Sequence, residues 1–313
     1  MTCAIRGVIP VLQTPFLDDE SIDWESLENE IDWALENKAD GVCAAMVSEW
    51  LRLTHRERRQ YMRVMVDGTA GRGCVIASVG AESTREATEL ARAAEDAGCH
   101  AVMAIPPITV RLPEREAESY YRRIAQATSL PLILQDASGY VGRPLSVELM
   151  ARLLDAFGPD KILFKPEAEP IGPNLSALRD ATAGQARILD GSGGVFLIDA
   201  YRRGTVGTIP AVDLLAAIVA LWSALETGDD RRAYEVYFPL AALVTLQMQA
   251  GLEGFLAIEK YLLVKQGVLP SDRRRGPVGW SLDEETAREV DRLYACLEEV
   301  VADAGGHDRR GAE

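Results

Sequence analysis

Short, nearly continuous apolar runs alternate with longer segments of helical period over the first two thirds of the chain. Apolar strands separated by helices are typical of a parallel sheet whose outer face is covered by those helices. Eight such units are the number that closes a (β/α)8, or TIM, barrel, so we predict this fold. The runs lie at residues 7–12, 41–47, 74–80, 101–106, 130–135, 161–165, 187–191 and 205–210.

The segments between the runs carry helix-start signals. Thr54 with Glu57, and Ser83 with Glu86, fit the capping box, in which a hydroxyl and a carboxylate satisfy free amide groups at a helix start. Pro113 suits the first position of another helix. These signals predict helices directly after three of the eight strands.

Strand-like runs stop after residue 210, and helical patterns follow at 211–228, 229–250 and 252–266. A further helix is predicted from the 3- and 4-residue spacing of Val290, Leu293, Leu297 and Val300. We therefore expect a barrel over residues 1–210, and a closing helix with a helical extension packed on the barrel over 211–303. The polar residues 304–313 are expected to be disordered.

Composition and net charge exclude some classes of binding partner. The 313 residues are 48% hydrophobic, and their net charge of -15 repels nucleic acid and anionic lipid surfaces. No apolar run approaches the ~18 residues that span a bilayer, and the start lacks signal-peptide features. We expect a cytoplasmic protein that binds neither nucleic acid nor membranes. Five scattered cysteines and three separated histidines predict no disulfide framework and no metal site.

Lys165 is the first candidate for chemistry. Active sites in this fold lie where the C-terminal ends of the strands meet the βα loops. Of five lysines, only Lys161 and Lys165 lie in a strand-like run, and Lys165 is at its C-terminal end. A lysine among apolar residues loses solvation of its charge and can attack a carbonyl carbon. The pattern equally allows Lys165 to extend from the strand end to water.

Glu167 shares the face of Lys165 if the strand geometry continues, because strand side chains alternate between two faces. A carboxylate beside an iminium can move protons at the neighbouring carbon atoms. Lys165 and Glu167 are therefore the candidate catalytic residues. The pattern leaves open that Glu167 pairs with an arginine on an ordinary loop.

Other polar residues follow the strands at the same edge, where hydroxyl and backbone amide groups can hold a substrate carboxylate. Turn formation or capping is an equally good explanation for Ser48 and Asp136. The glycine-rich segments 191–194 and 204–207 could cradle a phosphate, but they lack the patterns of nucleotide-binding loops. The candidate substrate-binding residues are Ser48, Glu49, Gln135, Asp136, Gly191 and Thr208.

Several segments resemble, in order and spacing, the dihydrodipicolinate synthase and N-acetylneuraminate lyase superfamily. They are GVIPVLQTPF, DGVCAAMVSEWLRLT, AVMAIPP, LPLILQDAS, ILFKPE and RRGTVGTIP. The resemblance implies a TIM-barrel enzyme of class I aldolase type, whose sixth-strand lysine forms a Schiff base with a 2-oxo acid. The matching position is Lys165. It also implies a homo-oligomer, a homotetramer or a homodimer.

Four positions depart from the commonest members of that superfamily. Met46 and Val47 stand where a GTTGE segment carries hydroxyl groups, and Gln135 stands where a YNVPxRTG segment carries its catalytic tyrosine. Tyr140 replaces the arginine of that segment, which recognises aspartate semialdehyde. These departures predict that dihydrodipicolinate synthase activity is lost.

Four other motifs are similar to the branch of the superfamily that includes L-2-keto-3-deoxyarabonate dehydratase. They are Ser-Glu at 48–49, Gln-Asp-Ala at 135–137, Lys-x-Glu at 165–167 and RRG-x-x-G at 202–207. Ser138 replaces the proline that usually follows Gln-Asp-Ala in this branch. The resemblance implies dehydration of a 2-keto-3-deoxy sugar acid through a Schiff base on Lys165, without metal or organic cofactor. The alternatives are retro-aldol cleavage to pyruvate plus an aldehyde, synthase activity, or a non-catalytic barrel that binds 2-oxo acids.

Overall fold

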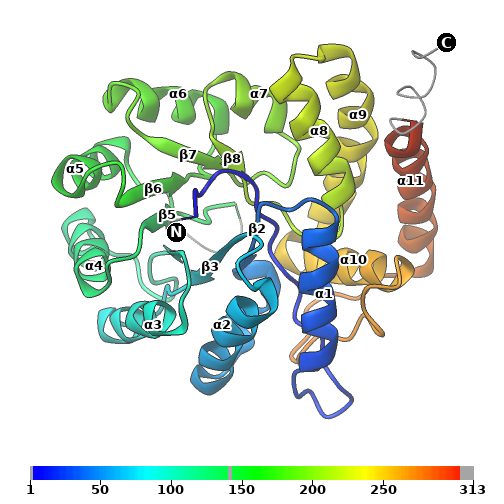
Figure 1. Cartoon of the computed structure of the whole chain (residues 1–313), viewed down its shortest axis with the longest axis horizontal. Coiled ribbons are helices and arrows are strands. Elements are labelled where there is room, and N and C mark those ends of the chain that lie inside the picture. Colours follow the sequence, from blue (N-terminus) through cyan, green and yellow to red (C-terminus); the bar gives the residue numbers. More distant parts are fainter. Residues whose placement is uncertain (1–2, 140–142, 304–313) are drawn as a thin grey trace.

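Eight parallel strands lie at the centre of the molecule, ringed by helices (Figure 1). The structure is a computed structural model, and it describes residues 3–139 and 143–303; Tyr140 and the tail at 304–313 fall outside these ranges. The strand order is β1-β8-β7-β6-β5-β4-β3-β2. The strands are β1 (Gly7–Val8), β2 (Gly41–Ala44), β3 (Cys74–Ser78), β4 (Ala101–Ala104), β5 (Leu132–Gln135), β6 (Ile162–Lys165), β7 (Arg187–Asp190) and β8 (Gly207–Thr208). The predicted (β/α)8 barrel is confirmed.

Extended backbone after β1 joins the first and last strands of this order. Val11 forms parallel bridges to Cys43 and to Ala211, and the Leu12 amide donates to the Cys43 carbonyl over 2.9 Å. Regular pairing in β1 covers only two residues of the predicted run 7–12, which includes a proline at position 10 that has no amide hydrogen to donate. The barrel therefore closes through isolated bridges.

The run at 41–47 is shorter as a strand than predicted. Met46–Ser48 forms a 3-10 turn in place of the last strand residues. The Ser48 hydroxyl accepts from the Ala45 amide over 3.1 Å and donates to the Leu12 carbonyl over 2.6 Å. These two bonds replace ladder bonds and turn the chain away from the barrel wall.

Side chains inside the barrel come from alternate strand positions, as the two-residue period requires. In β6, Leu163 belongs to the interior cluster, whereas Phe164 packs outward against the helices. Ile133 of β5 lies inside as well. Lys165 and Gln135, two residues further along each strand, consequently point into the barrel mouth.

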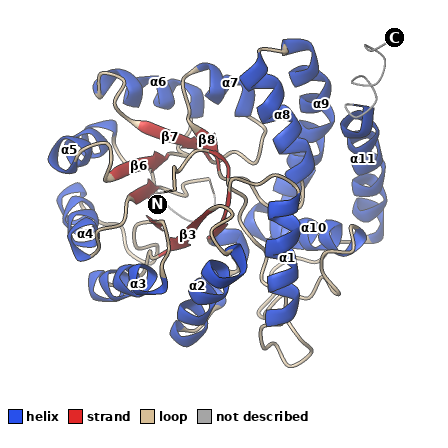
Figure 2. Cartoon of the chain, in the orientation of Figure 1, coloured by secondary structure: helices blue, strands red, loops and turns tan. Residues whose placement is uncertain are grey.

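The surrounding helices begin where their caps predict. Thr54 and Glu57 form the full capping box of α2 (His55–Thr69), but at Ser83 only the hydroxyl half forms, because the Glu86 carboxylate pairs with His55 at 2.9 Å. Pro113 is the residue just before α4. The ring, shown in Figure 2, comprises α1 (Trp24–Glu36), α2 (His55–Thr69), α3 (Thr84–Ala97), α4 (Glu114–Ala127), α5 (Val147–Phe157), α6 (Ile171–Ala181), α7 (Leu197–Arg202) and α8 (Leu215–Thr227).

Three more helices follow: α9 (Asp230–Gln247), α10 (Gly251–Lys265) and α11 (Glu284–Asp303). The stretch Asp230–Lys265 is long and apolar enough to cross a membrane. Length and composition alone are weak evidence for a membrane span, because buried core helices pass the same test. It is divided between two helices at Gly251, and α9 packs against α8 and α11. This packing buries part of the apolar surface of the stretch.

A buried ion pair joins the extension to the barrel. Lys260 of α10 is fully buried, and its Nζ donates to Glu49 Oε1 over 2.5 Å and to the Arg273 carbonyl over 2.7 Å. Glu49 Oε2 accepts from Arg52 Nη1 over 2.9 Å and from the Arg275 amide over 3.0 Å. One carboxylate thus connects the loop after β2, helix α10 and the segment that follows α10.

Replacing Lys260 by Met should lower the free energy of unfolding by about 3–5 kcal/mol, because Glu49 stays buried without its closest cation. Urea denaturation measures the loss. Lys265→Met is the matched control on the same helix, where the partly exposed pair with Asp291 should contribute at most about 1 kcal/mol. Equal losses in the two variants would show that the buried pair does not hold the extension in place.

Candidate active site

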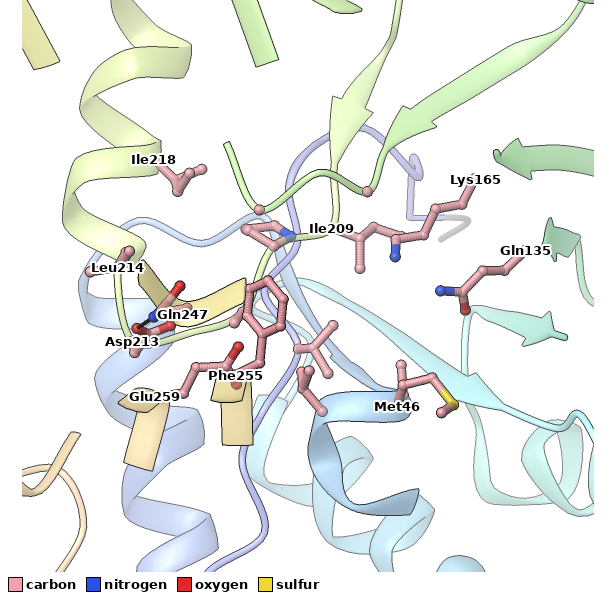
Figure 3. A pocket seen from close by; sticks show the side chains of 17 residues that line it. Met46, Gln135, Lys165, Ile209, Asp213, Leu214, Ile218, Gln247, Phe255 and Glu259 are labelled. Atoms are coloured by element: carbon pink, nitrogen blue, oxygen red, sulfur yellow. Dashed lines mark hydrogen bonds between the residues drawn. The ribbon is translucent and has the colours of Figure 1, made fainter. Parts of the chain in front are cut away.

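A cavity opens at the C-terminal ends of the strands, the location expected for this fold. Its lining comes from the ends of β2, β5, β6, β7 and β8 together with α8, α9 and α10 (Figure 3). Lys165, Gln135 and Gly191 are the predicted site residues that line it. Glu167 and Gly191 line an adjoining pocket towards α7. Lysine, glutamine and glutamate from neighbouring strands are thus brought together.

Lys165 and Glu167 form a buried pair. Lys165 is 5% exposed, and its Nζ lies 2.5 Å from Glu167 Oε1. Gln135, which pairs with Lys165 across the β5–β6 ladder, donates through Nε2 to the same Glu167 oxygen over 2.9 Å. Glu167 Oε2 and Gln135 Oε1 are buried without partners within the described part of the chain. Lys165 therefore does not extend to water, and Glu167 contacts no arginine through the bonds described.

Asp136 lies beneath this pair and does not line the cavity. Its Oδ1 accepts from the Glu167 amide over 3.0 Å and so holds the backbone that carries the carboxylate. Burial, followed by the nearby charge of Glu167, raises the pKa of Asp136 to about 6. Through this bond Asp136 positions the backbone of Glu167, and a direct contact of Asp136 with substrate stays a prediction.

Gly191 follows β7 and is packed tightly against the Lys165–Glu167 pair. A Cβ atom at this position would lie 2.6 Å from Glu167 Oε1 and 2.9 Å from Lys165 Cε. Any side chain there would displace the amine or the carboxylate. The glycine was predicted as a substrate contact, and the structure adds that its missing side chain leaves room for both groups.

Thr208 of β8 is hydrogen-bonded to β7 and lines neither of the two pockets described above. Its hydroxyl donates to Asp190 Oδ2 over 3.1 Å, and Ser192 donates to the same oxygen over 3.1 Å. Burial raises the pKa of Asp190 despite these bonds and the nearby charge of Lys165. The three residues tie β7 to β8 behind the cavity wall.

Ser48 and Glu49, the other two predicted substrate contacts, already have protein partners. The Ser48 hydroxyl holds the turn after β2, and Glu49 joins Lys260 and Arg52. Glu49 also has a left-handed backbone with φ of 52°. Neither residue lines the cavity around Lys165. These bonds match the turn-forming alternative that the sequence left open for Ser48.

The sequence did not identify Asp213, Gln247 and Glu259, which line the far side of the same cavity. All three were assigned to helical packing after residue 210. A usable signal was the sequence Glu259-Lys260 inside an otherwise apolar helix, since charged residues are rarely buried without a specific role. Burial raises the pKa of Asp213 to about 7.

The site's acidic groups are not arranged as a metal centre. Over residues 3–139 and 143–303, no group of three or more His, Cys, Asp or Glu side chains could hold a metal ion. The arrangement places the Lys165 amine within proton-transfer distance of the Glu167 carboxylate, and both side chains are buried. Such a pair can form an iminium with a carbonyl compound and then shift protons on it.

Comparisons with known proteins identify the family of this chain. Residues 4–295 match the family model described as "Dihydrodipicolinate synthetase family". A 4-hydroxy-tetrahydrodipicolinate synthase of Methanopyrus kandleri is 32% identical over 243 residues, which cover 76% of this chain and 80% of the relative. The L-2-keto-3-deoxyarabonate dehydratase of Azospirillum brasilense is 28% identical over 307 residues, which cover 95% and 96%.

Solved structures share the fold over almost the full length. The chloride inhibited dihydrodipicolinate synthase from Acinetobacter baumannii, complexed with pyruvate, superimposes with a TM-score of 0.84 at 26% identity, covering 94% of this chain and 99% of the other. Nearly the whole chain also matches the family model, as the motifs quoted above predicted. The chain belongs to the dihydrodipicolinate synthetase family.

Proposed function

We propose that the protein is a Schiff-base-forming lyase that dehydrates a 2-keto-3-deoxy sugar acid. The observation that carries the proposal is the buried contact of 2.5 Å between Lys165 Nζ and Glu167 Oε1, with Gln135 on the same oxygen. An amine alone would suffice for binding a 2-oxo acid. The adjoining carboxylate supplies the base and acid that elimination of water requires.

The first stage is formation of the iminium. Glu167 takes a proton from the Lys165 ammonium group, and the neutral amine attacks the C2 carbonyl carbon to give a carbinolamine. Glu167 returns the proton to the C2 hydroxyl, which leaves as water. The resulting iminium withdraws electrons from C3 and makes its hydrogens acidic, so no metal or organic cofactor enters the proposed reaction.

The second stage breaks the bond from C4 to its hydroxyl group. Glu167 removes one C3 proton, and the enamine so formed expels the C4 hydroxyl, which takes that proton and departs as water. For a pentonate, the transfer of one proton from C5 and one from its hydroxyl group to C3 and C4 gives an aldehyde at C5. Hydrolysis of the iminium then frees Lys165 and 2-oxoglutarate semialdehyde.

Two features support dehydration over synthase chemistry. Gln135 occupies the β5 position at which the superfamily's tyrosine is expected, and its amide cannot relay protons as a phenol does. Met46 lines the cavity with a thioether in place of a hydroxyl. Several relatives nevertheless carry the synthase name, which keeps synthase activity and retro-aldol cleavage as the alternatives to test.

Borohydride reduction in the presence of pyruvate should add one ligand mass to the protein, because hydride reduces the Lys165 iminium to a stable amine. Peptide mass spectrometry should locate the adduct at Lys165, and Lys165→Ala should abolish it. Lys161 is the internal control: it starts the same run, but its Nζ donates to the Thr128 carbonyl at 2.6 Å. An adduct at Lys161 or Lys260 would refute the assignment.

Glu167→Gln should still form the trapped adduct while dehydration falls by roughly 100- to 10000-fold, because the shape is kept and the base is lost. Trapping and turnover are measured on the same preparation. Glu169→Gln is the matched control, since Glu169 is exposed two residues away. If Glu167→Gln retained most of the wild-type turnover, the proton transfers would have to be assigned to Asp136 or another group.

Products separate dehydration from its alternatives. With L-2-keto-3-deoxyarabonate we expect semialdehyde, detected through an aldehyde dehydrogenase, and no pyruvate in a lactate dehydrogenase assay. With pyruvate and aspartate semialdehyde we expect only trace turnover. Pyruvate release would instead establish retro-aldol cleavage, and synthase rates of ~1 to 1000 per second would establish the synthase reaction.

A further inference from the structure

The cavity at Lys165 is polar at two separate ends. Lys165 and Gln135 form one end, and the other end, well separated from them in Figure 3, is formed by Asp213, Gln247 and Glu259. The wall between the two ends is apolar. It includes Ile209 and Phe255, and Leu214 and Ile218 add apolar surface beside the remote end (Figure 3). A ligand that fills this space has a polar head, an apolar middle and a polar tail.

The remote end is built from buried groups with defined bonds. Gln247 Nε2 donates to Asp213 Oδ2 over 2.7 Å, and the Gln13 side-chain amide donates to Glu259 Oε2. Glu259 is fully buried and lines the cavity, yet its Oε1 has no partner within residues 3–139 and 143–303. A buried polar atom without a partner is costly, so a hydrogen-bonding ligand would be stabilised there.

The charge at this end limits what that ligand can be. Burial raises the pKa of Glu259 well above its usual range, and the nearby charge of Asp213 raises it further, whereas the charge of Lys260 acts in the opposite direction. The neutral carboxyl group that this shift favours donates one hydrogen bond and accepts another. A hydroxyl group has the same capacity. A carboxylate or phosphate would bring a second negative charge into an apolar space that already holds two carboxyl groups.

We infer that Asp213, Gln247 and Glu259 form a second subsite, which binds a hydroxyl group at the end of the substrate and disfavours tails that end in an anion. This inference deepens the proposed function and rests on it, because Lys165 must hold the 2-oxo acid head. It narrows the substrate class to unphosphorylated sugar acids with a free terminal hydroxyl group.

Borohydride trapping of matched 2-oxo acids tests the subsite without requiring dehydration. The five-carbon series is 2-oxopentanoate, 5-hydroxy-2-oxopentanoate and 2-oxoglutarate, and the six-carbon series extends each by one methylene group. We expect the hydroxylated acid to reach half-saturation at a roughly five- to tenfold lower concentration than the alkyl acid. The dicarboxylic acid should need a roughly 100-fold higher concentration. No preference at either length, or tightest binding of the dicarboxylic acid, would overturn the inference.

Variants assign the preference to Glu259. Glu259→Met should reduce the hydroxyl preference to less than roughly twofold, whereas Glu259→Gln, which still donates and accepts, should keep it. Glu30→Gln is the matched control, because Glu30 accepts from the Gln13 amide over 2.7 Å but does not line the cavity. A preference that survives in Glu259→Met would refute the subsite.

Pyruvate, which has no tail, separates this inference from the proposed function. If pyruvate is trapped at Lys165 but the tail series shows no preference, the subsite is wrong and the Schiff-base chemistry stands. If neither pyruvate nor any longer acid is trapped, the proposed function fails and the subsite falls with it. Pyruvate trapping by each variant also shows that its active site has folded.

Discussion

The buried contact between Glu49 and Lys260 determines how the second half of the molecule meets the first. It joins the loop after β2 to α10, and Arg52 with the Arg275 amide completes the bonding of the carboxylate. Two charges removed from water are favourable only when each is fully bonded, which makes this contact intolerant of displacement. Helix α10 is thereby held across one side of the barrel mouth.

The position of α10 in turn defines the cavity. Glu259 is the neighbour of Lys260, so the ion pair that anchors the helix also sets where this carboxyl group faces the interior. Phe255, one turn earlier, contributes to the apolar wall. The shape of the site therefore depends on a residue, Glu49, that does not line the cavity itself.

Two buried lysine–glutamate contacts thus serve different purposes in one fold. Lys260 and Glu49 are fully enclosed and bonded to further groups, which suits a fixed structural joint. Lys165 and Glu167 face a cavity, and Glu167 Oε2 has no partner among the residues that the structure describes. A pair with unfilled bonding capacity beside open space can exchange its protons with a bound molecule. The difference lies in the surroundings, since the side chains are identical.

The sequence alone determined the barrel and the position of its reactive amine. Eight apolar runs specify a parallel sheet covered by helices, and the two-residue period places Lys165 on the inner face at the end of β6. Family motifs strengthened that assignment. These features are local, because apolar spacing and strand period depend on residues close together in the chain.

Only the tertiary structure decided which polar groups face the cavity. Ser48 and Glu49 follow β2 as predicted, yet the turn at Met46–Ser48 and the bond to Lys260 direct their side chains elsewhere. Asp213 and Glu259 lie in segments whose pattern indicated packing alone, and both line the cavity because the start of α8 and helix α10 lie along one side of it. Bonds between residues as far apart in the chain as Glu49 and Lys260 produce no periodic pattern in the sequence. The residues next to each partner follow the pattern of that partner's own helix or loop.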